Sequence, residues 1–356
     1  MTKRVLILGA SYGSLLGTKL LMAGHSVTLV CTAPTAELIQ REGTRVRFPG
    51  RGGAEPVEVA SRDLPGTLAA CAPEAADPGA FDLVVLAMQE AQYGAPGVRQ
   101  LMARVAGART PCLAIMNMPP LPYLRRIPGL ATRGLEGCYA HPEVWKDFDP
   151  ALVTLASPDP QAFRPADEGK NVLQVGLPTN FKAARFEADA PMRLLGELEA
   201  DIDGARLGDA RVEVPVKLKV HESVFVPLAK WPMLITGNYR CIRPGGMIPI
   251  RDAVHGDLAR SREIYEWVAA LCRRLGADAA DLVPFDKYAS AAAGLARPSS
   301  AARALFAGAR HIERVDSLVR RIAGQLEAHS EVLQEIVQLV DERLGSNRVG
   351  RELAAA

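Results

Sequence analysis

The chain has 356 residues, 48% of them hydrophobic and 23% charged, and a formal net charge of +2. This length exceeds one ordinary core, so we expect a globular protein of two domains. The nearly balanced charge and the lack of a concentrated basic stripe exclude a nucleic-acid partner. No apolar run is long enough to span a bilayer, so we expect no membrane partner either.

The cysteines show no CxxC pair and are scattered as Cys31, Cys71, Cys112, Cys138, Cys241 and Cys272. This pattern predicts reduced thiols in a reducing compartment, and we expect a cytoplasmic protein. Cysteines and histidines are not spaced as metal ligands, so we expect no metal. A signal peptide is not expected, because Lys19 interrupts the N-terminal apolar stretch and a second strand-like run follows at once.

The N-terminal residues predict a β-strand, a helix and a second strand. Residues 4–8 form a continuous apolar run, which is typical of a buried parallel strand. Residues 14–22 suit a helix, Gly24 and His25 make a turn, and residues 26–30 form the second strand. We therefore expect the chain to open with a βαβ unit.

The next region continues the alternation of strands and helices. Further strands are expected at residues 44–47, 83–87, 113–116, 134–139 and 172–175. Helices are expected at residues 36–41 and 98–106. Such alternation predicts a doubly wound parallel sheet. The Pro-, Asp- and Ala-rich residues 157–170 are expected to form a loop or surface excursion.

Helical periodicity dominates beyond about residue 190. Helices are expected at residues 192–198, 257–275, 312–326 and 332–344. The third of these carries one apolar face, made of Ile312, Val315, Leu318, Ile322 and Leu326. We therefore expect a sheet domain at residues 1–187 and a helical domain at residues 188–356.

Small residues occupy the turn after the first strand. A dinucleotide fold needs them there, because the backbone N–H groups must approach the pyrophosphate at a helix N-terminus. Gly17 would let that helix lie close to the sheet. The match to G-x-G-x-x-G is imperfect, and a tight turn without a ligand is the alternative. The preceding apolar strand favours a nucleotide, so we assign cofactor binding to Gly9, Ala10, Ser11, Tyr12 and Gly13.

The end of the second strand bears on the choice of cofactor. NAD-specific folds place an acidic residue there to bind the ribose 2′-hydroxyl. The strand ends instead in Val30, Cys31, Thr32 and Ala33, which favours NADP (NADPH) over NAD. No arginine stands in this stretch to bind the extra phosphate. We expect Thr32 to contact the cofactor.

Several stretches resemble the ketopantoate reductase family, in the family's order, from residue 4 to about residue 344. They are residues 13–30, Ala114-Ile-Met-Asn117, Lys217-Leu-Lys-Val-His221 with Val226-Pro-Leu228, and Pro298-Ser-Ser300 with His311-Ile-Glu313 and Asp316. The resemblance implies a Rossmann-type doubly wound sheet, followed by an all-helical domain like that of 6-phosphogluconate dehydrogenase. It also implies reduction of a 2-oxo acid to a 2-hydroxy acid, as in pantothenate biosynthesis, and it is compatible with a homodimer.

The chain also departs from the pattern of that family. Gln89 stands in place of a lysine, and Met118, Pro119 and Pro120 replace glycines. His221 replaces the asparagine of K-L-x-x-N, the residues after Ser300 are altered, and the loop around residues 140–170 is enlarged. These changes leave the fold and the hydride chemistry in place. They point away from ketopantoate itself as the substrate.

The resemblance nominates Lys217 as the acid that protonates the developing alkoxide, with a surface lysine as the alternative. His221 shares a face with Lys217 whether the period is 3.6 or 2, so it either contacts substrate, tunes the lysine or is an ordinary core histidine. The alternation of Val212 to Val220 indicates a strand, whereas the family has a helix starting near this lysine.

The remaining assignments also follow from the resemblance. Glu313 would pair with Lys217 or bind a substrate hydroxyl, and an exposed helix carboxylate is the alternative. Ser300 would bind the substrate carboxylate, unless it only caps a helix. Asn117, at the end of a strand, would contact cofactor and substrate, unless it is a turn residue. Gln89 is assigned to the cofactor.

The leading interpretation is an NAD(P)H-dependent 2-oxo acid reductase acting on a small-molecule substrate. Opine-type reductive amination, or oxidation of a bulkier alcohol on the same scaffold, is the first alternative, and His221 and residues 118–120 motivate it. A non-catalytic dinucleotide-binding protein is the second. Retention of Lys217, Glu313 and Ser300 together argues against it.

Overall fold

The computed structural model describes residues 1–50, 55–208 and 211–355, with side chains described as far as residue 349. The chain forms two compact units. The sheet unit comprises residues 1–88, 92–126 and 143–222, and the helical unit comprises residues 89–91, 127–142 and 223–356. The boundary expected at residues 187/188 therefore falls inside the sheet unit. The helix and the strand that follow it, α5 (Asp189–Gly204) and β12 (Leu218–His221), pack on that unit.

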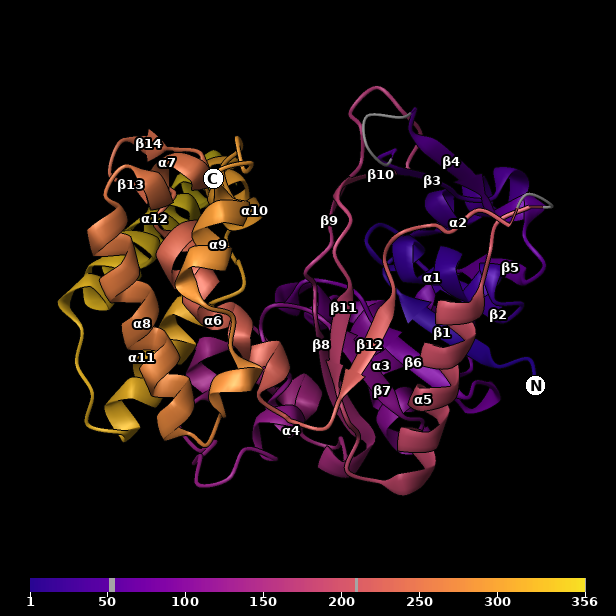
Figure 1. The fold of residues 1–356 in the computed structure, drawn as a ribbon, viewed down its shortest axis with the longest axis horizontal. Coiled ribbons are helices and arrows are strands. Elements are labelled where there is room, and N and C mark those ends of the chain that lie inside the picture. Colours follow the sequence, from indigo (N-terminus) through magenta and orange to yellow (C-terminus); the bar gives the residue numbers. More distant parts are fainter. Residues whose placement is uncertain (51–54, 209–210, 356) are drawn as a thin grey trace. The chain divides into compact units, whose positions relative to one another are not determined.

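Within the described ranges, the main sheet has eight strands in the order β12-β11-β8-β7-β6-β1-β2-β5 (Figure 1). Besides β12 they are β1 (Arg4–Leu8), β2 (Ser26–Val30), β5 (Thr67–Cys71), β6 (Leu83–Leu86), β7 (Cys112–Ile115), β8 (Val153–Ser157) and β11 (Phe181–Ala184). The strands from β8 to β5 run parallel, as expected for a doubly wound sheet. β11 runs antiparallel to β8, and β12 runs parallel to β11.

Helices bury the faces of this sheet. They are α1 (Gly13–Met22), α2 (Ala33–Glu42), α3 (Pro96–Ala108), the single turn α4 (Leu121–Leu124) and α5. Every residue of α1 is buried, because the sheet lies on one side of it and α5 packs against another. α5 lies along β12 (Figure 1). The core therefore continues under α5, which explains why the sheet unit extends beyond residue 187.

A second, smaller sheet in the same unit has the order β4-β3-β10-β9. Its strands are β3 (Arg45–Phe48), β4 (Val57–Ala60), β9 (Gln161–Phe163) and β10 (Val172–Leu177). The strands expected at residues 44–47 and 172–175 are present, but they pair with each other outside the main sheet. The expected loop at residues 157–170 contains β9, which pairs with β10.

The helical unit confirms the predicted change of architecture. Its main elements are α6 (Lys230–Met233), the π-helical turn η10 (Leu234–Tyr239), α7 (Ile250–His255), α8 (Leu258–Arg274), α9 (Phe285–Ala292), α10 (Ser300–Phe306), α11 (Val315–Gln325), α12 (Glu331–Ala355) and the hairpin β13 (Ile242–Arg243) with β14 (Gly246–Met247). The strand expected at residues 134–139 is wrong: a short 3-10 turn at Glu136–Cys138 stands there. None of the described helices is long and apolar enough to cross a membrane.

Candidate functional site

The turn after β1 has no room for side chains at its two glycines. Gly9 has φ +108, and a Cβ there would lie 2.6 Å from the Ala87 carbonyl oxygen. A Cβ on Gly13 would lie 2.5 Å from Ile7 Cγ2. Both positions are therefore restricted to glycine by the backbone and core of neighbouring strands.

The turn leads directly into α1. That helix begins at Gly13, and the N–H groups of Ser14 and Leu15 donate to the carbonyl oxygens of Ser11 at 3.2 Å and Tyr12 at 3.1 Å, which leaves the N–H groups of residues 11–13 at the N-terminus of the helix. They lie at the carboxyl end of a parallel strand, where open α/β sheets bind ligands. A Cβ on Gly17 would lie 3.5 Å from Ile7 Cδ1 and from Val27 Cγ1, which is ordinary van der Waals contact, so the helix–sheet packing does not require glycine there, contrary to our expectation. The geometry suits a pyrophosphate.

Tyr12 links the turn to other segments of the sheet unit through a ring contact and a hydrogen bond. Its ring meets Phe181 edge-on, with the centroids 5.8 Å apart, and its hydroxyl donates to the Pro160 carbonyl oxygen at 2.5 Å. Burial, and to a lesser degree Asp159, raise the pKa of Tyr12, so the phenol stays neutral. Ser11 contributes its carbonyl oxygen, which accepts from Ser14 Oγ at 2.8 Å. These contacts hold the loop in place before any ligand binds.

The carboxyl ends of β2 and β7 carry further predicted contacts. Thr32 is exposed just before α2, and its Oγ1 lies 3.0 Å from Thr35 Oγ1. Asn117 lies two residues beyond β7, on the same edge as Gly9, because β1, β6 and β7 run parallel in register. Met118, by contrast, is fully buried. It is a core residue, so its presence in place of glycine does not by itself shape a substrate pocket.

Gln89 comes three residues after the end of β6. Its side chain is exposed, and residues 89–91 group with the helical unit rather than with the sheet from which they emerge. The neighbouring Glu90 is 1% exposed and accepts from the backbone N–H groups of Ala140 at 3.0 Å and His141 at 3.4 Å. Glu90 therefore secures this short segment, and the cofactor role of Gln89 stays a prediction.

Lys217 lies immediately before β12, facing α5. Its Nζ is 2.9 Å from Asp203 Oδ1 and 2.9 Å from Glu213 Oε1. The hydrogen bonds to Asp203 and then to Glu213 raise the pKa of Lys217. A lysine held by two carboxylates gives up its proton less readily, which disfavours the acid role predicted for it.

His221 lies at the far end of β12. Because this strand runs opposite to β8 and its parallel neighbours, His221 sits at the edge away from Asn117 and Gly9. Its carbonyl oxygen accepts from the Arg185 N–H at 2.8 Å as part of strand pairing. The expected convergence of Lys217 and His221 in one pocket is therefore not present. The shared face is real, but a strand spaces residues four apart by about 13 Å.

In the helical unit a different lysine opens a helix. Lys230 is the first residue of α6, which continues directly into the π-helical turn η10. Such turns are frequent at functional sites. The Tyr288 hydroxyl donates to the Met233 carbonyl oxygen at 3.1 Å, which satisfies an acceptor near the change of helix type. The half-buried Asn238 stands eight residues after Lys230 in the same run.

The end of this run is tied to the predicted serine segment. Ser299 Oγ donates to the Asn238 carbonyl oxygen at 2.7 Å and accepts from the Ala302 N–H at 3.1 Å. Ser299 is thus the buried N-cap of α10, whereas Ser300 is the exposed first residue of that helix. The capping role falls to Ser299, which leaves the Ser300 hydroxyl as a predicted substrate contact.

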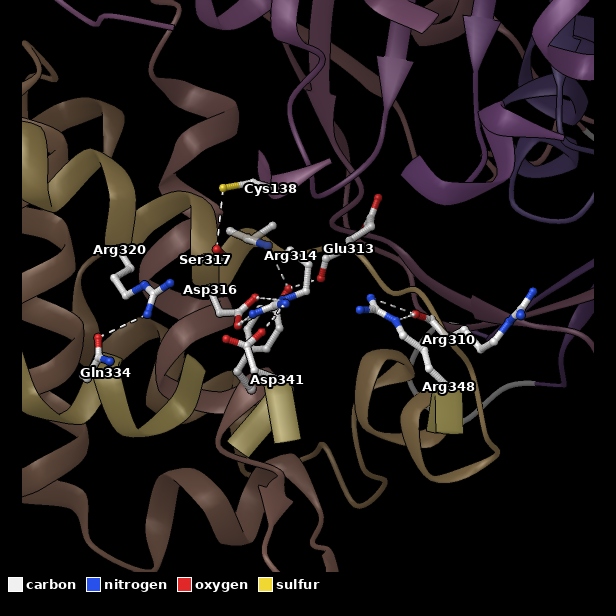
Figure 2. Close-up of polar contacts among 12 residues, drawn as sticks. Cys138, Arg310, Glu313, Arg314, Asp316, Ser317, Arg320, Gln334, Asp341 and Arg348 are labelled. Atoms are coloured by element: carbon white, nitrogen blue, oxygen red, sulfur yellow. Dashed lines mark hydrogen bonds and ion pairs between the residues drawn. The ribbon is translucent and has the colours of Figure 1, made fainter. Parts of the chain in front are cut away.

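The run is also tied to the segment that carries Glu313. The Tyr239 hydroxyl donates to the Glu313 carbonyl oxygen and accepts from the Val315 N–H at 3.0 Å. The guanidinium of the neighbouring Arg314 is directed to other carboxylates, since it binds Asp316 at 2.9 Å and Asp341 at 2.7 Å (Figure 2).

Hydrogen bonds thus bring the segments of Asn238, Ser299 and Glu313 together within one unit, and Lys230 lies eight residues before Asn238 in the same helical run. Lys230 was not singled out from the sequence. The alternation through Val220 predicted a strand beside Lys217 rather than a helix, and the structure confirms that strand as β12. The next lysine after Lys219 is Lys230, which begins α6.

Comparison with known proteins supports the resemblance inferred from the motifs. Residues 5–117 match the model of the family described as ketopantoate reductase PanE/ApbA. No curated protein matches the chain. The matched residues include the glycine turn and extend to Asn117, so the resemblance to ketopantoate reductases is confirmed for this part of the sheet unit.

Solved structures resemble almost the whole chain. A ternary structure of D-mandelate dehydrogenase with NADH and anilino(oxo)acetate has 13% identity and a TM-score of 0.65, covering 97% of this chain and 99% of that one. The 2-dehydropantoate 2-reductase of Methylococcus capsulatus has 14% identity and a TM-score of 0.65, covering 96% and 97%. A dimeric ketopantoate reductase from Staphylococcus aureus has 12% identity and a TM-score of 0.62, covering 97% and 99%. At such identities the likeness establishes the fold, which confirms the predicted Rossmann-type unit followed by a helical unit.

Proposed function

We propose that this chain is an NAD(P)H-dependent oxidoreductase that interconverts a 2-oxo acid and the corresponding 2-hydroxy acid. The observation that carries the proposal is the turn after β1, where neighbouring atoms would clash with a Cβ on Gly9 or Gly13. Dinucleotide folds use glycines in this turn for the tight bend after the first strand and for close packing of the helix on that strand. The match of residues 5–117 to the ketopantoate reductase model supports the same conclusion.

The sheet unit suits a dinucleotide. The N–H groups of Ser11, Tyr12 and Gly13 would bind the pyrophosphate, and Thr32 would contact the adenosine ribose. Asn117 lies on the same edge of the sheet, where the reacting half of the cofactor would extend. When bound, the reduced cofactor supplies a hydride to the substrate carbonyl carbon.

We propose Lys230, rather than Lys217, as the acid. An acid must hold its proton loosely enough to transfer it to the carbonyl oxygen as negative charge develops there. Lys217 is stabilised in its charged form by Asp203 and Glu213. Lys230 is half-buried at the start of α6, directly after the 3-10 turn η9 (Val226–Ala229). Its ammonium would both donate the proton and stabilise the oxyanion.

The other polar groups of the helical unit would position the substrate. A 2-oxo acid carries a carboxylate, and the Ser300 hydroxyl and the Asn238 amide are suitable donors for it. The Glu313 carboxylate would accept from a substrate hydroxyl. Its backbone carbonyl oxygen accepts from the Tyr239 hydroxyl, which holds this part of the chain beside the end of the helical run.

We also propose that ketopantoate is a poor substrate. Gln89 replaces a charged residue of the family pattern, which changes the contacts available to a small polar substrate. One structural neighbour is a D-mandelate dehydrogenase, and D-mandelate is a 2-hydroxy acid with an aromatic side chain. A panel of 2-oxo acids with aliphatic and aromatic side chains, and of 2-hydroxy acids in the reverse direction, tests the substrate class. Ketopantoate turnover at a kcat/KM of about 10⁴ M⁻¹s⁻¹ or more would contradict this proposal.

Cofactor binding is the first experiment. We expect a saturable fluorescence signal on titration with NADPH, with NADH or with both, and the titrations identify which cofactor binds. Gly13→Asp is a poor test of the phosphate site, because the new side chain would clash with Ile7 in the core and destabilise the fold. Ser11→Asp instead places a carboxylate at the turn beside the pyrophosphate, and it should abolish binding in a protein that still folds. An unchanged titration for Ser11→Asp would contradict the phosphate site.

The assembly state is a separate proposal. The Staphylococcus aureus ketopantoate reductase is described as dimeric, and we propose a homodimer here as well. Light scattering after size-exclusion chromatography measures the mass directly, and a monomeric mass across a wide concentration range would contradict it.

A further inference from the structure

The excursion between β8 and β10 borders the cofactor edge of the sheet unit. We define it as residues 158–170, which include β9 (Figure 1). The hydroxyl of Tyr12, in the glycine turn, donates to the Pro160 carbonyl oxygen at 2.5 Å. At its other end, a Cβ on Gly169 would lie 3.8 Å from Leu38 Cδ2 of α2. The excursion therefore spans from the phosphate turn to the helix that follows β2.

Arg164 comes directly after β9 in this excursion and is half-buried. Its positive charge reaches the thiol of Cys31, the first residue beyond β2. Burial and the neighbouring Cys71 raise the pKa of Cys31 to about 11, and the charge of Arg164 opposes that rise. Although Arg164 is far from β2 in sequence, its excursion is held to the glycine turn through Tyr12 and Pro160 and to α2 beside Leu38, which brings it to the side of the sheet where β2 ends.

The acidic residues of the excursion are bound to other cations. Asp159 Oδ2 lies 3.5 Å from Lys182 Nζ. Glu168 is held at 3.3 Å by Arg45 and at 2.6 Å by Arg47. In the part of the chain that the structure describes, no ion pair or hydrogen bond neutralises the Arg164 guanidinium. An anion arriving at the end of β2 would meet a positive charge.

The end of β2 has a defined role in dinucleotide folds. The adenosine ribose lies there, and an acidic side chain accepts from its 2′-hydroxyl in NAD-specific proteins. In NADP-specific proteins an arginine near the same point accommodates the 2′-phosphate. This chain has Cys31 and Thr32 at the position, neither of which would repel a phosphate. The sequence offers no arginine there, but the tertiary structure does.

We propose that Arg164 binds the 2′-phosphate of NADPH and makes this chain select NADPH over NADH. The inference rests on the proposed dinucleotide-binding function and adds its specificity residue. A guanidinium donates two parallel N–H groups to phosphate oxygens, a geometry that a lysine does not reproduce. NADH has no 2′-phosphate, so its binding does not depend on Arg164.

The test compares Arg164→Ala with a matched control, Arg45→Ala. Arg45 lies in the same small sheet and its loss removes the same charge, but it is paired with Glu168 and Glu58. Fluorescence titrations of both variants with NADPH and NADH give four dissociation constants to compare with the wild type. Arg164→Ala should weaken NADPH binding by roughly 10–100-fold, the effect of losing a charge-assisted hydrogen bond. NADH binding by that variant, and both cofactors with Arg45→Ala, should change by less than about threefold.

Competition by adenosine phosphates isolates the phosphate contact. In the wild type, 2′,5′-ADP should displace NADPH better than 5′-AMP does, and Arg164→Ala should erase that difference. Arg164→Lys should recover only part of it, because an ammonium supplies charge without the paired donors.

The outcomes separate this inference from the function on which it rests. Equal losses of NADPH and NADH in Arg164→Ala, or wild-type binding of NADH at least as tight as that of NADPH, would overturn the inference alone. A wild type that binds neither cofactor would overturn the proposed function and the inference together.

Discussion

The glycine turn of the sheet unit and the polar group of the helical unit are built in different ways. The turn is one contiguous stretch, residues 9–13, whose shape is imposed by atoms of adjacent strands. The polar group joins Asn238, Ser299 and Glu313, whose segments are linked by hydrogen bonds between distant parts of the chain. A site of the first kind can be recognised from sequence, whereas one of the second kind requires knowing which helix each residue begins or ends.

The two regions also tolerate change differently. At Gly9 and Gly13 a single added methyl group meets backbone or core atoms, so the constraint is steric. In the helical unit the constraint is a small number of hydroxyl contacts, such as those of Tyr239, whose loss leaves the surrounding helices intact. Substitutions in each region should show whether the glycine turn is limited by steric clashes and the helical unit by single hydrogen bonds.

The largest expected effect separates the two candidate lysines. Lys230→Met should slow the chemical step by roughly 10²–10⁴-fold, the usual contribution of a general acid. Lys217→Met removes two partly exposed ion pairs, with Asp203 and Glu213, and should change kcat by less than about threefold. Single-turnover kinetics with saturating cofactor measures both. A severe loss in Lys217→Met with a near-normal Lys230→Met would make Lys217 the acid after all.

The second prediction concerns the steric character of the turn. Gly9→Ala should lower the free energy of unfolding by roughly 3 kcal/mol or more, because backbone strain at φ +108 adds to a clash with the Ala87 oxygen. Gly24→Ala is the matched control, since Gly24 also has positive φ (+82) but no atom lies within 4 Å of its added Cβ. It should cost only about 1 kcal/mol of backbone strain. Equal losses in urea unfolding would show that the turn is not sterically closed.

A third effect arises on the helix that follows the turn. Lys19 is 1% exposed and its Nζ donates to the Val214 carbonyl oxygen at 2.8 Å. Burial, followed by the nearby charge of Lys217, lowers the pKa of Lys19 to about 8.

The unfolded chain therefore binds a proton that the folded chain has lost between about pH 8 and pH 10.5, so this group makes stability rise with pH across that window. The rise is on the order of 3 kcal/mol. Urea unfolding from about pH 7 to 11 should show a flatter profile for Lys19→Met than for the wild type. Parallel pH profiles of the unfolding free energy for Lys19→Met and the wild type would contradict the lowered pKa of Lys19.

The smallest effect tests the hydroxyl contacts of the helical unit. Tyr239→Phe leaves the Val315 N–H without its acceptor, which should cost roughly 1–3 kcal/mol of stability. It should also lower kcat, because Glu313 loses the donor that fixes its backbone. Tyr265→Phe is the matched control: its hydroxyl donates to the Val283 carbonyl oxygen at 2.7 Å, in contact with no predicted site residue. A similar fall in kcat for both variants would mean that Tyr239 acts only through stability.

Several elements could be predicted because their signals are local. The strands at residues 4–8 and 26–30 and the intervening helix match the structure within one residue. A buried parallel strand needs a continuous apolar run, and that run is visible without knowing its neighbours. The expectation at residues 134–139 was wrong for the converse reason. Only Leu135, Cys138 and Tyr139 of that stretch are buried, around a 3-10 turn, and periodicity alone does not separate such a turn from a short strand.

Sequence by itself determined the order of the two units, the glycine turn, and the lack of an acid at the end of β2. Each depends on residues that are adjacent in the chain, so spacing and side-chain chemistry were sufficient. Tertiary structure alone decided that Lys217 is held by Asp203 and that His221 lies at the opposite edge of the sheet from Asn117. It also brought the excursion that carries Arg164 to the glycine turn, through the hydrogen bond from Tyr12 to Pro160. Those outcomes depend on strand direction and on packing between distant segments, and neither property is encoded in the spacing of nearby residues.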